Sequence, residues 1–224
     1  MIKAYLSSSV GKKQIVAVTG LLLVGYLVFH LSMNLLIFLG AETYNFFPAK
    51  AHESGILLRI AELLLASIFI VHIVTTAKLV IQNKKSRQQS YQVTNPKGGR
   101  SLATRLMPYT GTILIVFLFV HIKQFVFADA AGVAGTVNDV NLGLYGVVSN
   151  TLTDPLHAIS YIIVMFAVGF HLAHGIQSVF QSFGYNNPTI TPLIQKVSTA
   201  VGVLFAIAFS SIPVYFLLMS GTAG

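Results

Sequence analysis

The fold is decided by residues 15–39, IVAVTGLLLVGYLVFHLSMNLLIFL, a stretch without a single charged side chain. At a helical rise of about 1.5 Å per residue, a run of this length crosses the hydrocarbon core of a bilayer, which is about 30 Å thick. The sequence therefore predicts an all-α integral membrane protein, a single domain over residues 1–224 with five transmembrane helices in a bundle. The other predicted spans are about 56–81, 109–127, 156–182 and 196–219.

The composition agrees with a membrane protein and narrows its chemistry. Hydrophobic residues make up 54% of the chain and charged residues only 9%, with a mean hydropathy of +0.76. A soluble domain needs more charge than this to cover its surface, so the composition excludes one. The absence of cysteine excludes a thiolate-held iron–sulfur cluster, a thiolate zinc site, a disulfide and a thioether-attached haem. A redox centre here must use histidine, methionine or a bound organic cofactor.

The charges sort to two sides of the predicted membrane. One side carries most of the basic residues: Lys3, Lys12, Lys13, Lys84, Lys85, Arg87, Lys97, Arg100, Arg105 and Lys196. The other side carries Lys50, Arg59 and all six acids: Glu42, Glu53, Glu62, Asp129, Asp139 and Asp154. The positive-inside rule then predicts a cytoplasmic N-terminus and a C-terminus outside. The net charge of +8 therefore indicates membrane topology and contacts with lipid headgroups rather than binding of nucleic acid. The polar stretch 82–107 on the same side is long enough to receive a soluble partner.

Four histidines lie well inside the first four predicted helices, one in each: His30, His72, His121 and His171. Ionisable side chains inside a membrane are costly and usually functional. At about 1.5 Å per residue, His30 and His121 lie roughly 12–15 Å below the outer surface, and His72 and His171 roughly 20–24 Å. Two pairs at two depths predict two bis-histidine haems. Such haems have no open coordination position and suit electron transfer, and the second ring nitrogen of each ligand is expected to donate a hydrogen bond.

Alternatives remain for these histidines. Each could instead make a hydrogen bond between helices, and His174, one turn beyond His171, could take the place of His171 because the two lie on nearly the same helix face. A metal-ion transporter would normally add carboxylates within the membrane, and Glu62 is the only acid inside a predicted span.

Two stretches of the sequence resemble a known family. They are Ser8–Lys13 (SSVGKK), followed by Thr19-Gly20-Leu21 and Phe29-His30-Leu31 with Asn34, and Phe170–Gly175 (FHLAHG), followed by Gln177-Ser178 and Gln181-Ser182. With the helix count and the histidine pattern, they are similar to the five-helix cytochrome b558 subunits. These are single-chain, di-haem membrane anchors of bacterial succinate:quinone and quinol:fumarate oxidoreductases. The resemblance implies a distal haem on His30 and His121 and a proximal haem on His72 and His171, the same pairing that the depths predict.

The resemblance further implies a role in respiratory complex II, the succinate dehydrogenase or fumarate reductase of the tricarboxylic acid cycle. The chain would lie in the bacterial cytoplasmic membrane and carry two haems b. It would exchange electrons with quinone, menaquinone by family association. A flavoprotein and an iron–sulfur subunit would dock on its cytoplasmic face, and the chain itself would have no dehydrogenase active site. The alternatives are a cytochrome b subunit of a hydrogenase or formate dehydrogenase, and a transporter with structural histidines.

Further residues are candidates for quinone and haem contacts. The quinone-site candidates are His52, Arg59, Glu62 and His157, with Glu53 beside them. Glu62 could accept a proton from quinol if burial shifted its pKa, although Arg59 and Glu62 at a spacing of three could simply form an ion pair. Lys78 and Gln181 could bind the propionates of the proximal haem, and Lys123 those of the distal one. The alternative for both lysines is snorkelling to headgroups.

Overall fold

The computed structural model describes residues 2–85 and 102–221. Arg87, Lys97 and Arg100, which the sequence assigns to a partner-binding connection, lie outside the described residues. The elements in chain order are α1 Ile2–Ser7, α2 Ser9–Leu35, η1 Leu36–Leu39, α3 Ala41–Glu53, α4 Ile56–Lys85, α5 Leu102–His121, η2 Ile122–Val126, η3 Val133–Gly135, β1 Thr136–Val137, β2 Val140–Asn141, α6 Gly143–Leu152, α7 Pro155–Ser182 and α8 Thr191–Gly221.

The predicted five spans are confirmed. Within the described residues, five helices are long and apolar enough to cross a membrane: Ser9–Leu39, Ile56–Lys85, Leu106–Val126, Pro155–Ser182 and Thr191–Met219. The first span begins earlier than predicted because Ser8 caps α2, its hydroxyl accepting a 3.0 Å hydrogen bond from the backbone N–H of Gly11. The fourth begins at Pro155, one residue before the predicted start, with Asp154 as its cap.

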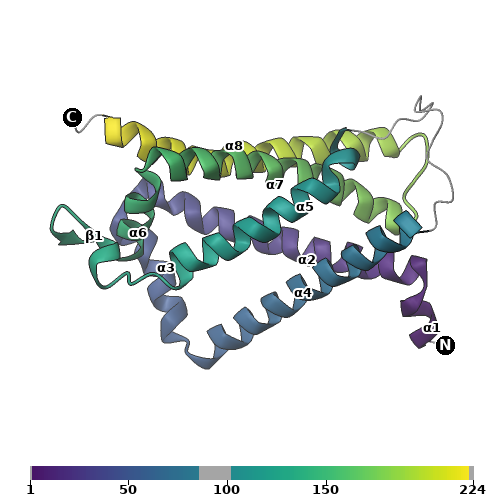
Figure 1. Ribbon diagram of the computed structural model, residues 1–224, viewed down its shortest axis with the longest axis horizontal. Helices are drawn as coiled ribbons and strands as arrows, with labels where there is room; N and C mark the ends of the chain where they lie inside the picture. Colours follow the sequence, from purple (N-terminus) through teal and green to yellow (C-terminus); the bar gives the residue numbers. More distant parts are fainter. Residues whose placement is uncertain (1, 86–101, 222–224) are drawn as a thin grey trace.

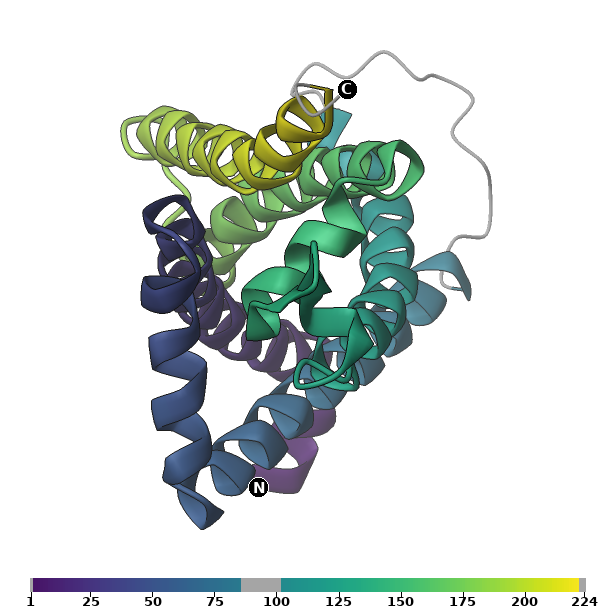
Figure 2. The same ribbon diagram turned by 90° about the vertical axis from the view of Figure 1, so that its left-hand side faces the viewer.

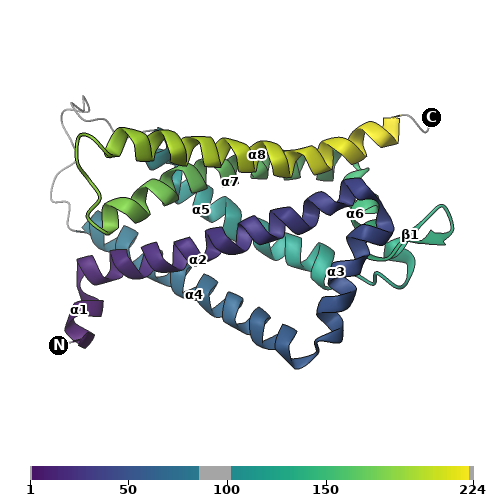
Figure 3. The same ribbon diagram turned by 180° about the vertical axis from the view of Figure 1, so that it is seen from behind.

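Helix α7 lies at the centre of the bundle. It packs against α8, α5 and α2, while α2 also packs against α4 (Figures 1 and 3). The end-on view shows the helices arranged around a common axis, with α3, α6 and the small hairpin at one end (Figure 2). Many of the buried core side chains come from α7 and α8: Tyr161, Met165, Val168, Leu172, Phe205, Ile212 and Phe216.

Small residues let α7 and α8 approach closely. A Cβ atom added to Gly169 would meet the carbonyl oxygen of Gly202 at 2.7 Å, and one added to Gly202 would clash with the carbonyl oxygen of Gly169. Ala206 and Ala173 lie next to these two glycines. Membrane helices gain packing energy from such contacts, since lipid tails are as apolar as the helices themselves. The pair α7–α8 therefore forms the rigid half of the bundle.

Helix α4 is held much more loosely. None of its described side chains is buried, and its extensive contacts within the described residues are with α2. His72 and His171 thus lie on two helices, α4 and α7, that make at most marginal contact.

A polar cap closes the end of the bundle that carries the acids. The side chain of Asn45 on α3 donates a 2.8 Å hydrogen bond to the carbonyl of Leu142 and accepts one of 3.1 Å from the backbone N–H of Tyr145 on α6. Strands β1 and β2 pair in an antiparallel hairpin beside α6. The sequence did not predict this cap.

We predict that Gly202→Ala lowers the stability of the bundle, whereas Gly25→Ala does not. The new methyl group at residue 202 would press on the backbone of Gly169, an overpacking that costs about 1–3 kcal/mol. A Cβ at Gly25, also within a transmembrane helix, meets nothing within 4 Å. The apparent midpoint of thermal unfolding in detergent measures both. Equal midpoints for the two variants would contradict the close α7–α8 contact.

Candidate functional site

The first pair of histidines meets between α2 and the end of α5. The ring centroids of His30 and His121 lie 5.8 Å apart, with an interplanar angle of 81°. An imidazole nitrogen binds a metal at about 2 Å, so two rings on opposite sides of one metal have centroids about 6 Å apart. The pair therefore has the spacing of two ligands that share a metal. The π-helical turn η2 follows His121 directly, a distortion that is common beside functional residues.

Aromatic rings surround this pair. The ring of Tyr26 stacks on His30 at 5.5 Å, and that of Phe209 lies 6.1 Å away. Phe117 and Phe125, one turn to either side of His121, lie 5.4 and 5.1 Å from its ring. These rings give His30 and His121 apolar surroundings in which water has little place.

Tyr161 lies between His121 and Gln124. Its hydroxyl donates a 2.6 Å hydrogen bond to the side-chain oxygen of Gln124 and lies 3.5 Å from Nδ1 of His121. In the tautomer that carries its proton on Nδ1, His121 donates to this hydroxyl, and Nε2 then has the lone pair that a metal needs.

His72 is held in the same way by α2. The hydroxyl of Thr19 donates to the carbonyl of Ile15 at 2.7 Å and lies 3.0 Å from Nδ1 of His72. In the tautomer that carries its proton on Nδ1, His72 donates to this hydroxyl, and Nε2 then has the lone pair. The neighbouring Gly20 makes room for the ring: a Cβ there would lie 3.2 Å from Cε1 of His72.

His171 has a second copy of this arrangement, supplied by α5. The hydroxyl of Thr110 donates to the carbonyl of Met107 at 3.1 Å and lies 3.3 Å from Nδ1 of His171. A Cβ on Gly111 would lie 3.6 Å from Cε1 of the same ring. Two Thr-Gly pairs on two helices thus hold one histidine each. Three of the four predicted ligands thus have a hydroxyl group beside Nδ1.

The two histidines of α7, His171 and His174, both remain candidate ligands. The ring of His171 lies beside Thr110 and Gly111 of α5. Within the described residues no group of three or more His, Cys, Asp or Glu side chains converges on one point.

The other predicted site residues have exposed side chains. Arg59 and Glu62 form an ion pair of 2.7 Å on α4, and their side chains are 65% and 43% exposed. This is the ion pair given above as the alternative to a proton-accepting role for Glu62. His52 lies exposed near the end of α3, and Glu53 pairs with Lys50. The residues predicted to bind propionates, Lys78, Lys123 and Gln181, are all exposed.

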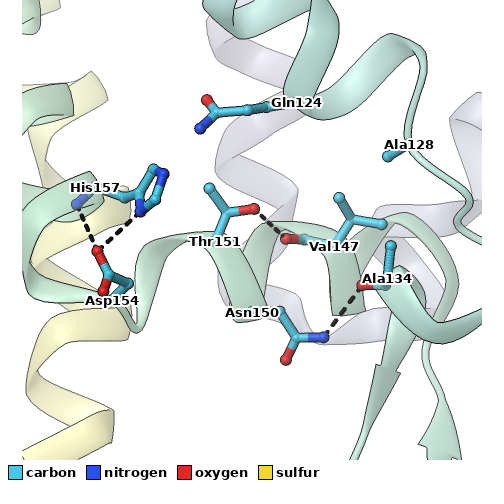
Figure 4. Close-up of a pocket in the computed structure, with 8 residues that line it drawn as sticks. All are labelled: Gln124, Ala128, Ala134, Val147, Asn150, Thr151, Asp154 and His157. Carbon is cyan, nitrogen blue, oxygen red and sulfur yellow. Dashed lines mark hydrogen bonds and ion pairs between the residues drawn. The ribbon is translucent and has the colours of Figure 1, made fainter.

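His157, another quinone-site candidate, lines a pocket together with Gln124 and Thr151 (Figure 4). Its Nδ1 lies 2.8 Å from Oδ1 of Asp154, and its backbone N–H donates to the same oxygen at 2.9 Å. These two hydrogen bonds, that of the backbone first, hold the pKa of the Asp154 carboxyl below its usual range. Asp154 and His157 thus form a polar pair at the start of α7.

Sequence reasoning missed the residues that orient the ligands. Thr19 and Gly20 entered only as part of a family motif, whereas Thr110, Gly111 and Tyr161 were not singled out at all. The repeated Thr-Gly pair at 19–20 and 110–111 was a usable signal. The contacts of Tyr161 were not, because its partners belong to another helix.

We predict that Asp154→Asn destabilises the protein near neutral pH but not in acid. Asparagine keeps the helix-capping oxygen and removes only the charge. A carboxyl whose pKa is lower in the folded chain stabilises above its unfolded pKa, about 3.9, and loses this effect as the pH falls through the folded pKa. Thermal unfolding of both proteins from about pH 7 down to about pH 3 tests this. A difference that stays constant over this range would contradict the role of the charge.

Comparison with known proteins leaves the function to be argued from the site. No family model matches the chain, no curated protein matches it, and no solved structure does.

Proposed function

We propose that this chain is a di-haem b-type cytochrome, the membrane anchor of a succinate dehydrogenase or fumarate reductase. His30 and His121 hold the distal haem, and His72 and His171 the proximal one. The observation that carries the proposal is the set of hydroxyl contacts from Thr19, Thr110 and Tyr161 to the Nδ1 atoms. Metal-bound histidines characteristically donate their other N–H in this way.

The pairs fit haem better than a bare metal ion. A pair supplies two nitrogens, whereas structural zinc takes four protein ligands. A porphyrin brings four nitrogens of its own and needs only one ligand on each face. The pair His30–His121 has the spacing for this. For the second pair, the loose packing of α4 leaves α7 apart from it, and Gly20 and Gly111 let the rings of His72 and His171 lie close to α2 and α5.

The chemistry of a bound b haem with two imidazole ligands is reversible one-electron transfer without an open coordination position. The chain's own residues do the rest. Thr19, Thr110 and Tyr161 keep the rings in one tautomer and one orientation. The aromatic side chains around His30 and His121 limit the access of water.

The distribution of charge supports the orientation and the partners of the proposal. Lys12, Lys13, Lys84, Lys85 and Lys196 lie at the end of the bundle opposite the acidic cap. By the positive-inside rule this end faces the cytoplasm. A flavoprotein and an iron–sulfur subunit dock there, and electrons pass between them and membrane quinone through two sites at two depths. The membrane is the cytoplasmic membrane of a bacterium.

A protein with purely structural histidines is the competing proposal, because the same hydroxyl contacts also join helices. The two proposals differ in the role of Nε2. Haem binding needs this atom in each of the four rings, whereas helix joining uses Nδ1 alone.

We predict that His72→Ala removes one of two haems from the purified complex and uncouples quinone from the soluble subunits. The substitution removes one axial ligand, while the pair His30–His121 is on other helices and should keep its haem. Haem per chain, measured as the pyridine haemochrome, gives the result.

His52→Ala is the matched control, because His52 is an exposed histidine at the acidic end of the bundle. It should retain both haems. If His72→Ala also retains both, His72 is not a ligand.

We also predict that Thr19→Val weakens proximal haem binding and that Thr19→Ser restores it. Valine has nearly the shape of threonine but cannot accept the hydrogen bond from Nδ1 of His72. Loss of such an outer contact typically lowers metal affinity about 10- to 100-fold. Haem retained after dilution in detergent, and the reduction potential of the proximal haem, measure the effect. Equal retention in the Thr19→Val variant and the wild type would show that the contact only joins helices.

A further inference from the structure

A hydrogen bond joins α2 and α4 at the end of the bundle opposite the acidic cap. Nζ of Lys12, in the first turn of α2, donates to the side-chain oxygen of Gln82, in the last turn of α4, at 3.0 Å. Figures 1 and 3 show these two helix ends at the same end of the bundle. Lys12 is partly buried, whereas its contact with Gln82 is exposed. The stem of Lys12 is therefore held in place while its ammonium group stays at the surface.

Lys12 has no acidic partner among the described residues. Gln82 is neutral, and a lysine ammonium group has three N–H donors, of which this contact uses one. All six acids of the sequence lie toward the other end of the bundle. The ion pairs that the described residues form are there too: Lys50–Glu53, Arg59–Glu62 and Asp154–His157. The charge of Lys12 and its other donors therefore remain for an anion from outside this part of the chain.

Further lysines lie near this contact along both helices. Lys13 follows Lys12, and Lys78 and Lys85 lie on the same face of α4 as Gln82, at spacings of four and three residues. The side chains of Lys13, Lys78 and Lys85 are exposed. We call Lys12, Lys13, Lys78 and Lys85 the basic corner of the bundle. A cluster of about four to eight basic residues where a transmembrane helix leaves the bilayer is typical of sites for anionic lipid headgroups.

Apolar side chains continue from the basic corner along α4. Val80 and Ile81, next to Gln82, are exposed, as is Val10 near Lys12. None of the described side chains of α4 is buried, and α2 is the described helix against which α4 packs extensively. The other sides of α4 are then free to lie against acyl chains, which are as apolar as these side chains. A ligand that fits both surfaces has an anionic head and apolar chains.

We propose that the basic corner is a binding site for an anionic phospholipid. A phosphate oxygen of the headgroup accepts a hydrogen bond from Lys12, the neighbouring lysines add positive charge, and the acyl chains lie against Val80 and Ile81. The contact with Gln82 holds the ammonium group of Lys12 before the lipid arrives, so less side-chain freedom is lost on binding. The carboxylate of a soluble partner would also match the lysines, but it would leave the apolar side chains without a ligand. No haem takes part in this site, which is therefore independent of the proposed function.

A fixed site differs from the general attraction of a basic surface for anionic lipids. Lys196 allows the comparison, because it is an exposed lysine at the same end of the bundle, in the second turn of α8. General attraction depends on Lys12 and Lys196 alike, whereas the proposed site depends on Lys12.

The test uses tryptophan fluorescence, because the chain has no tryptophan of its own. Ile81→Trp places a reporter beside the basic corner, and Ile56→Trp places a matched reporter at the other end of α4; the two isoleucines are 54% and 75% exposed. Each full chain is reconstituted in vesicles of phosphatidylcholine and phosphatidylglycerol, in which only one of the two lipids carries bromine, a quencher, on its acyl chains. A free phosphate ion at Lys12 gives no quenching.

Brominated phosphatidylglycerol should quench the reporter at residue 81 more than its share of the bilayer predicts, and the reporter at residue 56 in proportion to that share. Quenching in proportion at both positions would overturn the inference.

Lysine variants of the Ile81→Trp chain test the role of Lys12. Lys12→Gln should lower the preference for phosphatidylglycerol about fivefold, the usual effect of one lysine at a membrane surface, whereas Lys12→Arg and Lys196→Gln should retain it. Equal preference in Lys12→Gln and Lys196→Gln would overturn the inference. Loss of haem from Lys12→Gln with unchanged quenching would also overturn it, because Lys12 would then pair with a haem carboxylate.

Discussion

An imidazole inside a bilayer needs a partner for its N–H, and the rest of this structure depends on how the chain provides one. Water is scarce at these depths, and an unpaired polar group costs several kcal/mol in hydrocarbon. Thr19, Thr110 and Tyr161 supply the partner for three of the four rings. When a ring donates from Nδ1 to its hydroxyl, the ring nitrogen that remains is the one that can bind a metal.

The same requirement explains the uneven packing of the bundle. Helices α7 and α8 interlock through Gly169 and Gly202, whereas α4 touches mainly α2 and buries no described side chain. In the proposed function, the tight pair supplies rigidity, and the loose helix supplies one ligand of the proximal haem.

Much of the fold follows from sequence because membrane thickness leaves few choices. The five long apolar runs predict five helices, and the depths of His30 and His121 predict that they meet, as the 5.8 Å ring separation shows. The cap of α3, α6 and the hairpin does not follow, because it depends on single side chains such as Asn45 that bridge distant segments. The same holds for Tyr161, whose two contacts cross between helices. The ion pair of Arg59 and Glu62 is the opposite case, because their spacing of three along one helix is enough to predict it.

The most direct test of the account is the haem content of the wild-type chain, isolated with its partners from cells supplied with haem. The account predicts two haems b per chain, both low-spin in the ferric state because each iron has two imidazole ligands. One haem per chain would make one histidine pair structural. None would contradict the central claim and leave the hydroxyl contacts as ordinary links between helices.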